Sequence, residues 1–173
     1  QNTRHNVGFM SVDLFMKEQN GNFNKSKMQA VFGECRIGSN RVLVVKPQTY
    51  MNNSGAAVTQ IAKFYKIPLE RIIVVCDDIN LDIGQVRIRR KGSDGGQRGM
   101  RDIIELFGSS DIARIQIGVG KKPHPGYNLA DWVLSKFPKE SADDLNKALE
   151  KSVGALSEII VRSIDSAMNK YSS

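Results

Sequence analysis

The sequence predicts an α/β protein: one domain, residues 1–173, whose mixed, mostly parallel, twisted sheet is flanked by helices. Segments with the period of strands alternate along the chain with segments with the period of helices, which is typical of this class. Residues 72–78, Ile-Ile-Val-Val-Cys-Asp-Asp, form an apolar run of strand length, which is typical of a central strand buried on both faces. A length of 173 residues without an internal repeat suits one domain with a substantial core.

The composition indicates a globular protein that binds a polyanion. Hydrophobic residues make up 40% and charged residues 25%, and we find neither a membrane span nor a signal-peptide pattern. Cys35 and Cys76 lack metal-ligand spacing and form no disulfide framework, so we expect a reducing, cytoplasmic setting. The net charge is +7, and phosphates attract such a balance. Many of the basic residues gather in one segment: Arg87, Arg89, Arg90, Lys91, Arg98 and Arg101.

The first half of the chain is predicted to contain a helix, a hairpin and a second helix. Residues 7–16 have apolar residues at helical spacing, and residues 20–27 form a polar loop. Two strands, 30–37 and 41–46, are joined by Gly-Ser-Asn, which is typical of a hairpin. Ser54 can cap a helix that runs to about residue 65.

The second half is predicted to alternate strands with helices. After the strand at 72–78, residues 85–90 alternate apolar residues with arginines, as in a strand with one wet, basic face. A glycine-rich loop, residues 92–99, leads into a helix over 100–107 that ends at Gly108. Then follow a strand over 114–119, a short helix over 129–137 and a last helix capped by Ser141.

Two carboxylates end the strand at 72–78, where open α/β sheets bind ligands. Either Asp77 or Asp78 would lie at the mouth of a site, or both merely cap the strand and meet water. The chain has two histidines, His5 and His124, and a lone histidine is usually a surface or capping residue. A carboxylate partner would change this for His5, because it would orient the imidazole for general-base chemistry. Asp77 is the natural partner.

Two loops offer further chemistry. Residues 46–55 follow a strand and precede a helix, and they contain Tyr50, Met51 and Asn52. An amide can orient water or bind a carbonyl oxygen, and a tyrosine can stack on a base; the alternative is an ordinary cap formed by Ser54. The glycine-rich loop suggests phosphate binding, but it has neither the Walker nor the dinucleotide-binding pattern.

Taken in order, these motifs resemble those of bacterial-type peptidyl-tRNA hydrolase. The matching stretches are Thr-Arg-His-Asn-Val-Gly-Phe at 3–9, Lys-Pro-Gln-Thr-Tyr-Met-Asn-Asn-Ser-Gly at 46–55, Asp-Asp-Ile-Asn-Leu at 77–81, the loop at 92–99 and Arg-Ile-Gln-Ile-Gly-Val-Gly at 114–120. The resemblance implies a monomeric α/β fold of phosphorylase/hydrolase-like architecture and a metal-independent esterase. Such an enzyme cleaves the bond between a peptide and the 3'-terminal ribose of tRNA.

The resemblance also implies roles for individual residues. His5 is similar in position to the family's general base, Asp77 to the carboxylate that holds it and Asn52 to the amide that positions water or the scissile carbonyl. Tyr50 and Met51 would line the pocket for the terminal adenosine. Arg89 stands at a position that the family uses for tRNA and would contact the acceptor stem, and Gln97 and Arg98 would contact the substrate. Arg114 is also expected to bind tRNA, because it lies two residues from position 116, on the same face, where the family commonly has a tRNA-binding arginine.

This chain departs from the family pattern in three places. Gln97 and Arg98 replace the usual His-Asn pair, and Gln116 replaces an arginine that commonly serves tRNA binding. The family's first strand and its site asparagine are absent from this sequence, and we expect them to belong to the working protein. Two rival hypotheses follow: a non-catalytic RNA-binding relative of the splicing-factor kind, which the Gln97-Arg98 change favours, and a small-molecule esterase, which leaves the positive charge unused.

Overall fold

The computed structural model describes residues 3–48 and 54–172. The chain forms two compact units that are interleaved in sequence. Unit 1 comprises Gln1–Phe15, Val75–Ile88 and Ile115–Ser173, and unit 2 comprises Met16–Val74 and Arg89–Arg114. Each unit is described by itself below.

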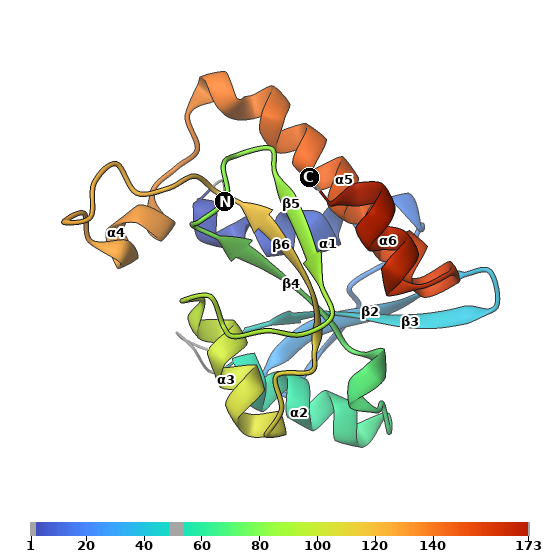
Figure 1. Cartoon of the computed structure of the whole chain (residues 1–173). Coiled ribbons are helices and arrows are strands. Elements are labelled where there is room, and N and C mark those ends of the chain that lie inside the picture. The colour runs from blue at the N-terminus through green and yellow to red at the C-terminus, as the bar shows by residue number, and fades with distance from the viewer. Residues whose placement is uncertain (1–2, 49–53, 173) are drawn as a thin grey trace. The chain divides into compact units, whose positions relative to one another are not determined.

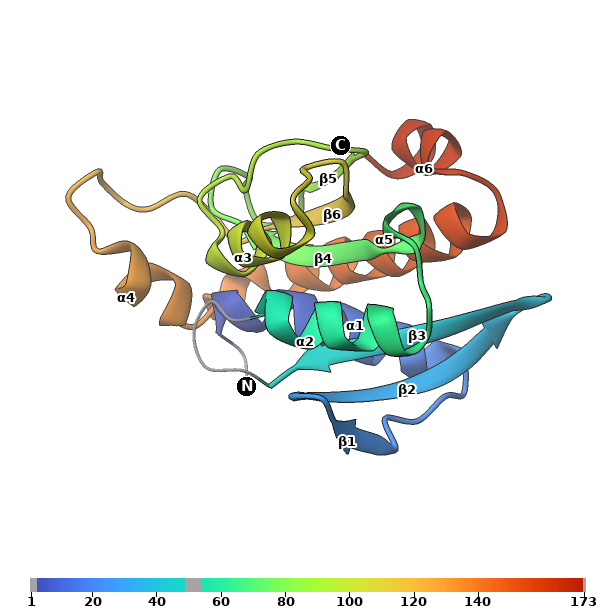
Figure 2. The ribbon, with the colours of Figure 1, turned by 90° about the horizontal axis from the view of Figure 1, so that it is seen from below.

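Unit 2 contains an antiparallel three-stranded sheet in the order β1-β2-β3 (Figure 2). β2, Ala30–Ile37, and β3, Asn40–Pro47, pair along their whole length. The predicted hairpin is therefore confirmed, with Gly38 in the left-handed region at its turn (φ 59°). β1, Lys25–Lys27, pairs with β2 inside the segment predicted as a polar loop. Its Lys-Ser-Lys sequence has no apolar alternation, so the pattern could not reveal this strand.

Two helices of unit 2, α2 (Ser54–Phe64) and α3 (Arg98–Phe107), pack against each other (Figure 2). The Gly55 N–H at the start of α2 donates to Asp102 Oδ2 at 2.6 Å, which pairs one of the donors left open at a helix start. α3 ends at Gly108 with a left-handed φ of 68°, as predicted. A short 3-10 turn, η2 (Leu69–Arg71), precedes the next strand. Two apolar clusters form the core: Ala30, Phe32, Ala57 and Ile61, and Met100, Ile103 and Ile112.

A second three-stranded sheet has the order β4-β6-β5, and each of its strands has residues in both units (Figure 1). Its strands are β4 (Ile73–Asp78), β5 (Val86–Arg89) and β6 (Ala113–Gly118). Within unit 1, the Val119 N–H donates to the Asp78 carbonyl at 3.1 Å and the Gly118 N–H to the Gln85 carbonyl at 2.9 Å. These bonds join the end of β6 to the end of β4 and to the start of β5, so β6 runs parallel to β4 and antiparallel to β5.

The observed sheets refine the prediction. The described strands are divided between two sheets rather than gathered in one, and the short connection between β2 and β3 requires an antiparallel pair. The middle strand of the second sheet is β6 rather than the predicted run at 72–78. β6 is buried over residues 114–118, whereas β4 is fully buried only at Cys76, Asp77 and Asp78. The two acidic residues at the carboxyl end of β4 are therefore both buried.

The helices of unit 1 begin with η1, Arg4–Asn6, a 3-10 turn that leads into α1, Val7–Glu18. The C-terminal part contains α4 (Leu129–Leu134), η3 (Lys139–Ser141), α5 (Ala142–Val161) and α6 (Ile164–Tyr171) (Figure 1). α5 begins where predicted, although the Ser141 side chain makes no capping bond. None of the helices in residues 3–48 and 54–172 is long and apolar enough to cross a membrane.

α6 was not predicted as a separate helix. The Ser163 side chain caps it by accepting from the Ser166 N–H at 3.1 Å, a signal that the Ser-Ile-Asp-Ser sequence at 163–166 offered. α6 packs tightly on α5, because a Cβ at Gly154 would lie 2.6 Å from the Tyr171 ring. The contact places the C-terminal helix against the long helix of the same unit.

Candidate active site

His5 and Asp77 form a pair in unit 1. His5 lies in η1, immediately before α1, and Asp77 lies near the carboxyl end of β4. His5 Nδ1 is 3.5 Å from Asp77 Oδ1, an ion-pair distance longer than a short hydrogen bond. The His5 side chain is 54% exposed, whereas that of Asp77 is 5% exposed. A buried carboxylate thus faces one ring nitrogen and leaves Nε2 to meet solvent or substrate.

Gly8 explains how the two residues come together. A Cβ at Gly8 would lie 2.6 Å from the Val75 carbonyl oxygen, a distance that real Cβ atoms do not tolerate. Only glycine therefore allows α1 to approach β4 this closely. Because His5 lies one turn before Gly8 and Asp77 lies two residues after Val75, the same close contact brings the imidazole to the carboxylate.

The environment of His5 makes it a better base. The contact with the Asp77 carboxylate raises the pKa of His5, partial burial acts in the opposite direction, and the negative charge of Asp77 adds to the rise. The net result is a pKa above the ordinary value of an imidazole. A carboxylate at Nδ1 also favours the tautomer whose Nε2 carries the lone pair, which is the form that accepts a proton from water.

Asp78 has a different task from its neighbour. Its side chain is buried, and Oδ1 accepts from the Asn80 N–H at 2.8 Å, closing the turn that follows β4. The sequence left open whether Asp77 and Asp78 belong to a site or cap the strand. The structure divides the two roles: Asp77 faces the histidine, and Asp78 caps the turn.

Arg4, the neighbour of His5, was missed as a functional candidate. It is 4% exposed and donates to the carbonyls of Val119 and Lys136 and to the Ser135 hydroxyl. Burial lowers the pKa of Arg4, and the charge of Tyr127 opposes that effect. In the sequence Arg4 stands in a polar stretch at the N-terminus, and only its position beside His5 hinted at a role.

The glycine-rich loop of unit 2 is organised by Asp94 and Gln97. Asp94 Oδ1 accepts from the Gly96 N–H at 2.7 Å, and Oδ2 accepts from Arg101 Nε at 3.1 Å. The backbone bond from Gly96, followed by the bond from Arg101, lowers the pKa of Asp94. Gln97 Oε1 accepts from the Met100 N–H at 2.6 Å and so caps α3. The amide oxygen predicted to contact the substrate is therefore bonded to the helix start.

The structure corrects the prediction for Arg114. This residue was expected on an accessible face for tRNA contact, but it is 1% exposed. Its guanidinium donates to the carbonyls of Ile112 at 3.1 Å, Ser93 at 2.6 Å and Ser110 at 2.8 Å. A buried guanidinium bonded to three backbone oxygens is not presented to an external phosphate. Arg114 instead ties the beginning of the glycine-rich loop to the segment before β6.

The remaining predicted binding residues differ in what the structure says of them. Arg89 and Arg98 are exposed in unit 2, as a phosphate contact would require, and Arg98 begins α3. Tyr50, Met51 and Asn52 lie outside the described residues.

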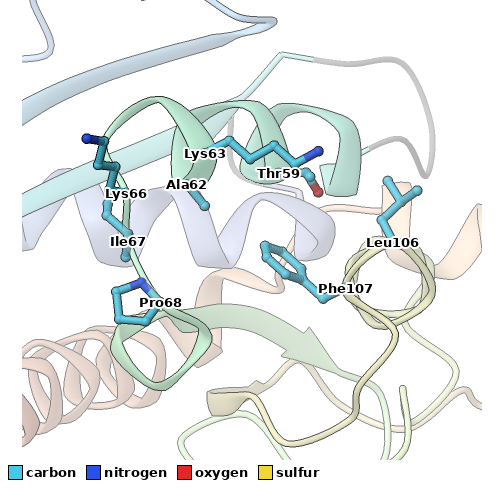
Figure 3. Close-up of a pocket in the computed structure, with 8 residues that line it drawn as sticks. All are labelled: Thr59, Ala62, Lys63, Lys66, Ile67, Pro68, Leu106 and Phe107. Atoms are coloured by element: carbon cyan, nitrogen blue, oxygen red, sulfur yellow. The ribbon is translucent and has the colours of Figure 1, made fainter.

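Unit 2 has a cavity of about 460 Å³ between α2 and α3 (Figure 3). Its lining is apolar apart from Thr59, Lys63 and Lys66, and it includes neither a carboxylate nor an imidazole. The lining therefore lacks the histidine and carboxylate that the His5–Asp77 pair provides. Over the described residues, no group of three or more His, Cys, Asp and Glu side chains could hold a metal ion.

Comparisons with known proteins agree along almost the whole chain. The family model described as "Peptidyl-tRNA hydrolase" matches residues 1–173. The peptidyl-tRNA hydrolase of Clostridium botulinum (strain Alaska E43 / Type E3) is 47% identical over 170 residues, covering 98% of this chain and 87% of that protein. That of Elusimicrobium minutum is 46% identical over 169 residues, covering 98% and 90%.

The fold gives the same result. The crystal structure of peptidyl-tRNA hydrolase from Acinetobacter baumannii is similar with a TM-score of 0.92 and 28% sequence identity, covering 99% of this chain and 87% of that one. A complex of peptidyl-tRNA hydrolase with N-propanol is similar with a TM-score of 0.91. The predicted α/β class is thereby confirmed.

Proposed function

This chain belongs to the peptidyl-tRNA hydrolase family, and on that premise we propose how its own residues hydrolyse peptidyl-tRNA. The observation that carries the mechanism is the His5–Asp77 pair, with a distance of 3.5 Å between Nδ1 and Oδ1. Water needs a general base to attack an ester carbonyl rapidly. An exposed imidazole held by a buried carboxylate is suited to that task.

In the proposed reaction, His5 Nε2 removes a proton from water as the water oxygen bonds to the ester carbonyl carbon. Asp77 stabilises the imidazolium that forms, and the Asn52 amide positions the water or stabilises the oxyanion. The bond between that carbon and the ribose oxygen then breaks, and the proton held by His5 passes to the ribose oxygen. The products are a peptide with a free carboxyl group and a deacylated tRNA.

Substrate binding is proposed for the basic and aromatic residues. Arg89 and Arg98, both exposed, would contact phosphates of the acceptor stem, and Tyr50 and Met51 would receive the CCA end. Gln97, which caps α3, would act by shaping the loop. We further propose that the enzyme works as a monomer in the cytoplasm without a cofactor.

The hydrolase is favoured over both rival hypotheses. A protein that only binds RNA has little physical need of a histidine held by a buried carboxylate, and the relatives named above are hydrolases. A small-molecule esterase would leave the net charge of +7 without a partner.

The decisive assay compares the hydrolysis of N-acetyl-aminoacyl-tRNA with that of unblocked aminoacyl-tRNA. We expect rapid cleavage of the blocked substrate alone. His5→Ala should abolish turnover while tRNA binding persists, and His124→Asn, which changes the other histidine, should retain full activity. Unchanged turnover in His5→Ala would remove His5 from the mechanism, and absent turnover in the wild type with tRNA still bound would favour the RNA-binding relative.

A further inference from the structure

The turn that carries His5 is a minimal element that leads directly into α1. η1 is only three residues long, and Thr3, which precedes it, makes no side-chain capping bond. His5 is itself half exposed and pairs with Asp77 at a distance longer than a short hydrogen bond. A turn of this kind needs contacts elsewhere to keep one geometry.

Arg4 supplies those contacts. Its Nε donates to the Val119 carbonyl at 2.8 Å, and Nη1 donates to the Ser135 hydroxyl at 2.8 Å and to the Lys136 carbonyl at 2.7 Å. The Arg4 backbone N–H also donates to the Ser135 carbonyl at 3.1 Å, and Thr3 forms an isolated β-bridge with Lys136. The turn is thus fastened to the end of β6 and to the segment after α4.

Aromatic rings complete the surroundings of the buried cation. The Arg4 guanidinium carbon lies 3.7 Å from the centre of the Trp132 ring and 5.4 Å from that of Phe137, a stacked geometry that stabilises a desolvated cation. The Trp132 Nε1–H donates to the Gly120 carbonyl at 2.8 Å. The ring is therefore fixed to the residue next to Val119, one of the acceptors of Arg4.

We propose that Arg4 is a positioning residue of the reaction, which fixes His5 against Asp77 by fastening η1 to β6 and to the segment after α4. The planar guanidinium can reach several acceptors and stack at the same time, whereas a lysine ammonium cannot. A small displacement of a catalytic base is costly, since a misplacement of about 1 Å can slow a reaction about 100-fold. This inference rests on the proposed role of His5 as the general base.

The test is Arg4→Lys, which keeps the positive charge and removes the planar guanidinium group. Two histidines make the titration of the His5 ring easy to follow by NMR, with His124 as an internal reference. We expect the pKa of His5 to fall toward the ordinary imidazole value and kcat to fall about 10- to 100-fold with a smaller change in KM. Arg41→Lys, which alters an exposed arginine paired with Glu34, is the matched control and should leave both quantities at wild-type values.

A double-mutant cycle separates positioning from a general structural effect. In an Asp77→Asn background, Arg4→Lys should cause no further change in the pKa of His5, because the pairing on which Arg4 acts is already lost. An unchanged His5 titration and kcat in Arg4→Lys, or fully additive effects in the cycle, would overturn the proposal. If Arg4→Lys does not fold, Ser135→Ala removes one acceptor alone and should move the pKa of His5 in the same direction by less; no movement there would also overturn it.

The two proposals fail in different ways. Turnover that survives His5→Ala would end the proposed role of His5, yet the NMR titration of Arg4→Lys would still decide whether Arg4 positions the ring. If His5→Ala is inactive but the His5 ring of Arg4→Lys titrates as in the wild type, only the inference about Arg4 is overturned.

Discussion

Arg4 and Arg114 are both buried arginines, but they organise their surroundings over very different sequence distances. The side-chain acceptors of Arg4 lie 115 to 132 positions away in the chain. Those of Arg114 lie 2, 4 and 21 positions away. Arg4 also stacks on Trp132, whereas Arg114 donates to the backbone carbonyls of Ile112, Ser93 and Ser110.

The difference suggests a division of labour between two regions. Arg4 joins distant segments beside the His5–Asp77 pair, whose geometry sets the rate of the chemical step in the proposed mechanism. Arg114 ties the beginning of the glycine-rich loop, which contains Arg98, to the segment before β6. We therefore expect changes near His5 to act on kcat and changes near the loop to act on KM and tRNA affinity.

After His5→Ala, the largest expected effect is that of Asp77→Asn. Without the carboxylate, kcat should fall about 10²- to 10⁴-fold, because the imidazolium loses its partner. In the wild type, kcat/KM should rise with pH up to the raised pKa of His5, since only neutral His5 is a base; in Asp77→Asn this transition should move to lower pH. Asp78→Asn is the control, because Asp78 caps a turn, and it should leave the pH profile in place.

The same pair links pH to stability. Because folding raises the pKa of His5, the pair stabilises the fold fully below the unfolded-state pKa of about 6.5. This contribution is lost as the pH rises through the folded-state value. Thermal unfolding from pH 5 to pH 9 should show this loss in the wild type and not in Asp77→Asn, and an identical pH dependence in both would contradict the pairing.

Gly8→Ala should come next. The added methyl group meets the Val75 carbonyl, so α1 must move away from β4 and His5 away from Asp77. We expect kcat to fall about 10- to 100-fold and stability to fall by about 1–3 kcal/mol. Gly126→Ala, where the nearest atom to an added Cβ lies 3.4 Å away, is the control. Wild-type kinetics in Gly8→Ala would show that the close contact does not set the position of His5.

Arg114→Lys tests the other region. A lysine cannot reach all three carbonyls, and a buried carbonyl left unpaired, as that of Ile112 would be, costs about 1–3 kcal/mol. We therefore expect lower stability and a KM several-fold higher with kcat little changed. Steady-state kinetics and thermal unfolding measure both, with Arg36→Lys on an exposed site as the control. If kcat of Arg114→Lys fell as far as that of Asp77→Asn, the expectation that the loop region acts on KM rather than on kcat would be wrong.

The smallest expected effect is that of Arg89→Ala. Removing one phosphate contact should weaken tRNA binding several-fold and reduce the slope of log affinity against log salt by about 1. Arg162→Ala removes an equal charge from a side chain that is 72% exposed and pairs with Glu158, and it should leave the slope unchanged. An unaltered slope in Arg89→Ala would place the tRNA elsewhere.

Most helices and strands, and the pairing of His5 with Asp77, could be predicted from the sequence for identifiable reasons. The hairpin, the end of α3 at Gly108 and the strand before Asp77 depend on local patterns of apolar and turn residues. His5 and Asp77 could be paired because one precedes a helix, the other ends a strand, and both match motifs of a known family.

Burial of arginine could not be predicted in the same way. Arg4 and Arg114 resemble surface charges in the sequence, and most of their acceptors are backbone oxygens that carry no sequence signal. Asp77 and Asp78 are adjacent and identical, yet only the fold decides which one faces His5 and which one closes the turn. Strand β1 was missed because its pairing with β2 comes from tertiary structure rather than from its own residues.

Trp132 is the only tryptophan in the chain, and it lies under the Arg4 guanidinium with its Nε1–H bonded to Gly120. Intrinsic fluorescence excited at the indole band therefore reports from one place only, the junction of η1 with the segment around α4. The emission of Trp132 can therefore be followed without an attached label. A change in its wavelength or intensity when tRNA is added would indicate a rearrangement close to His5.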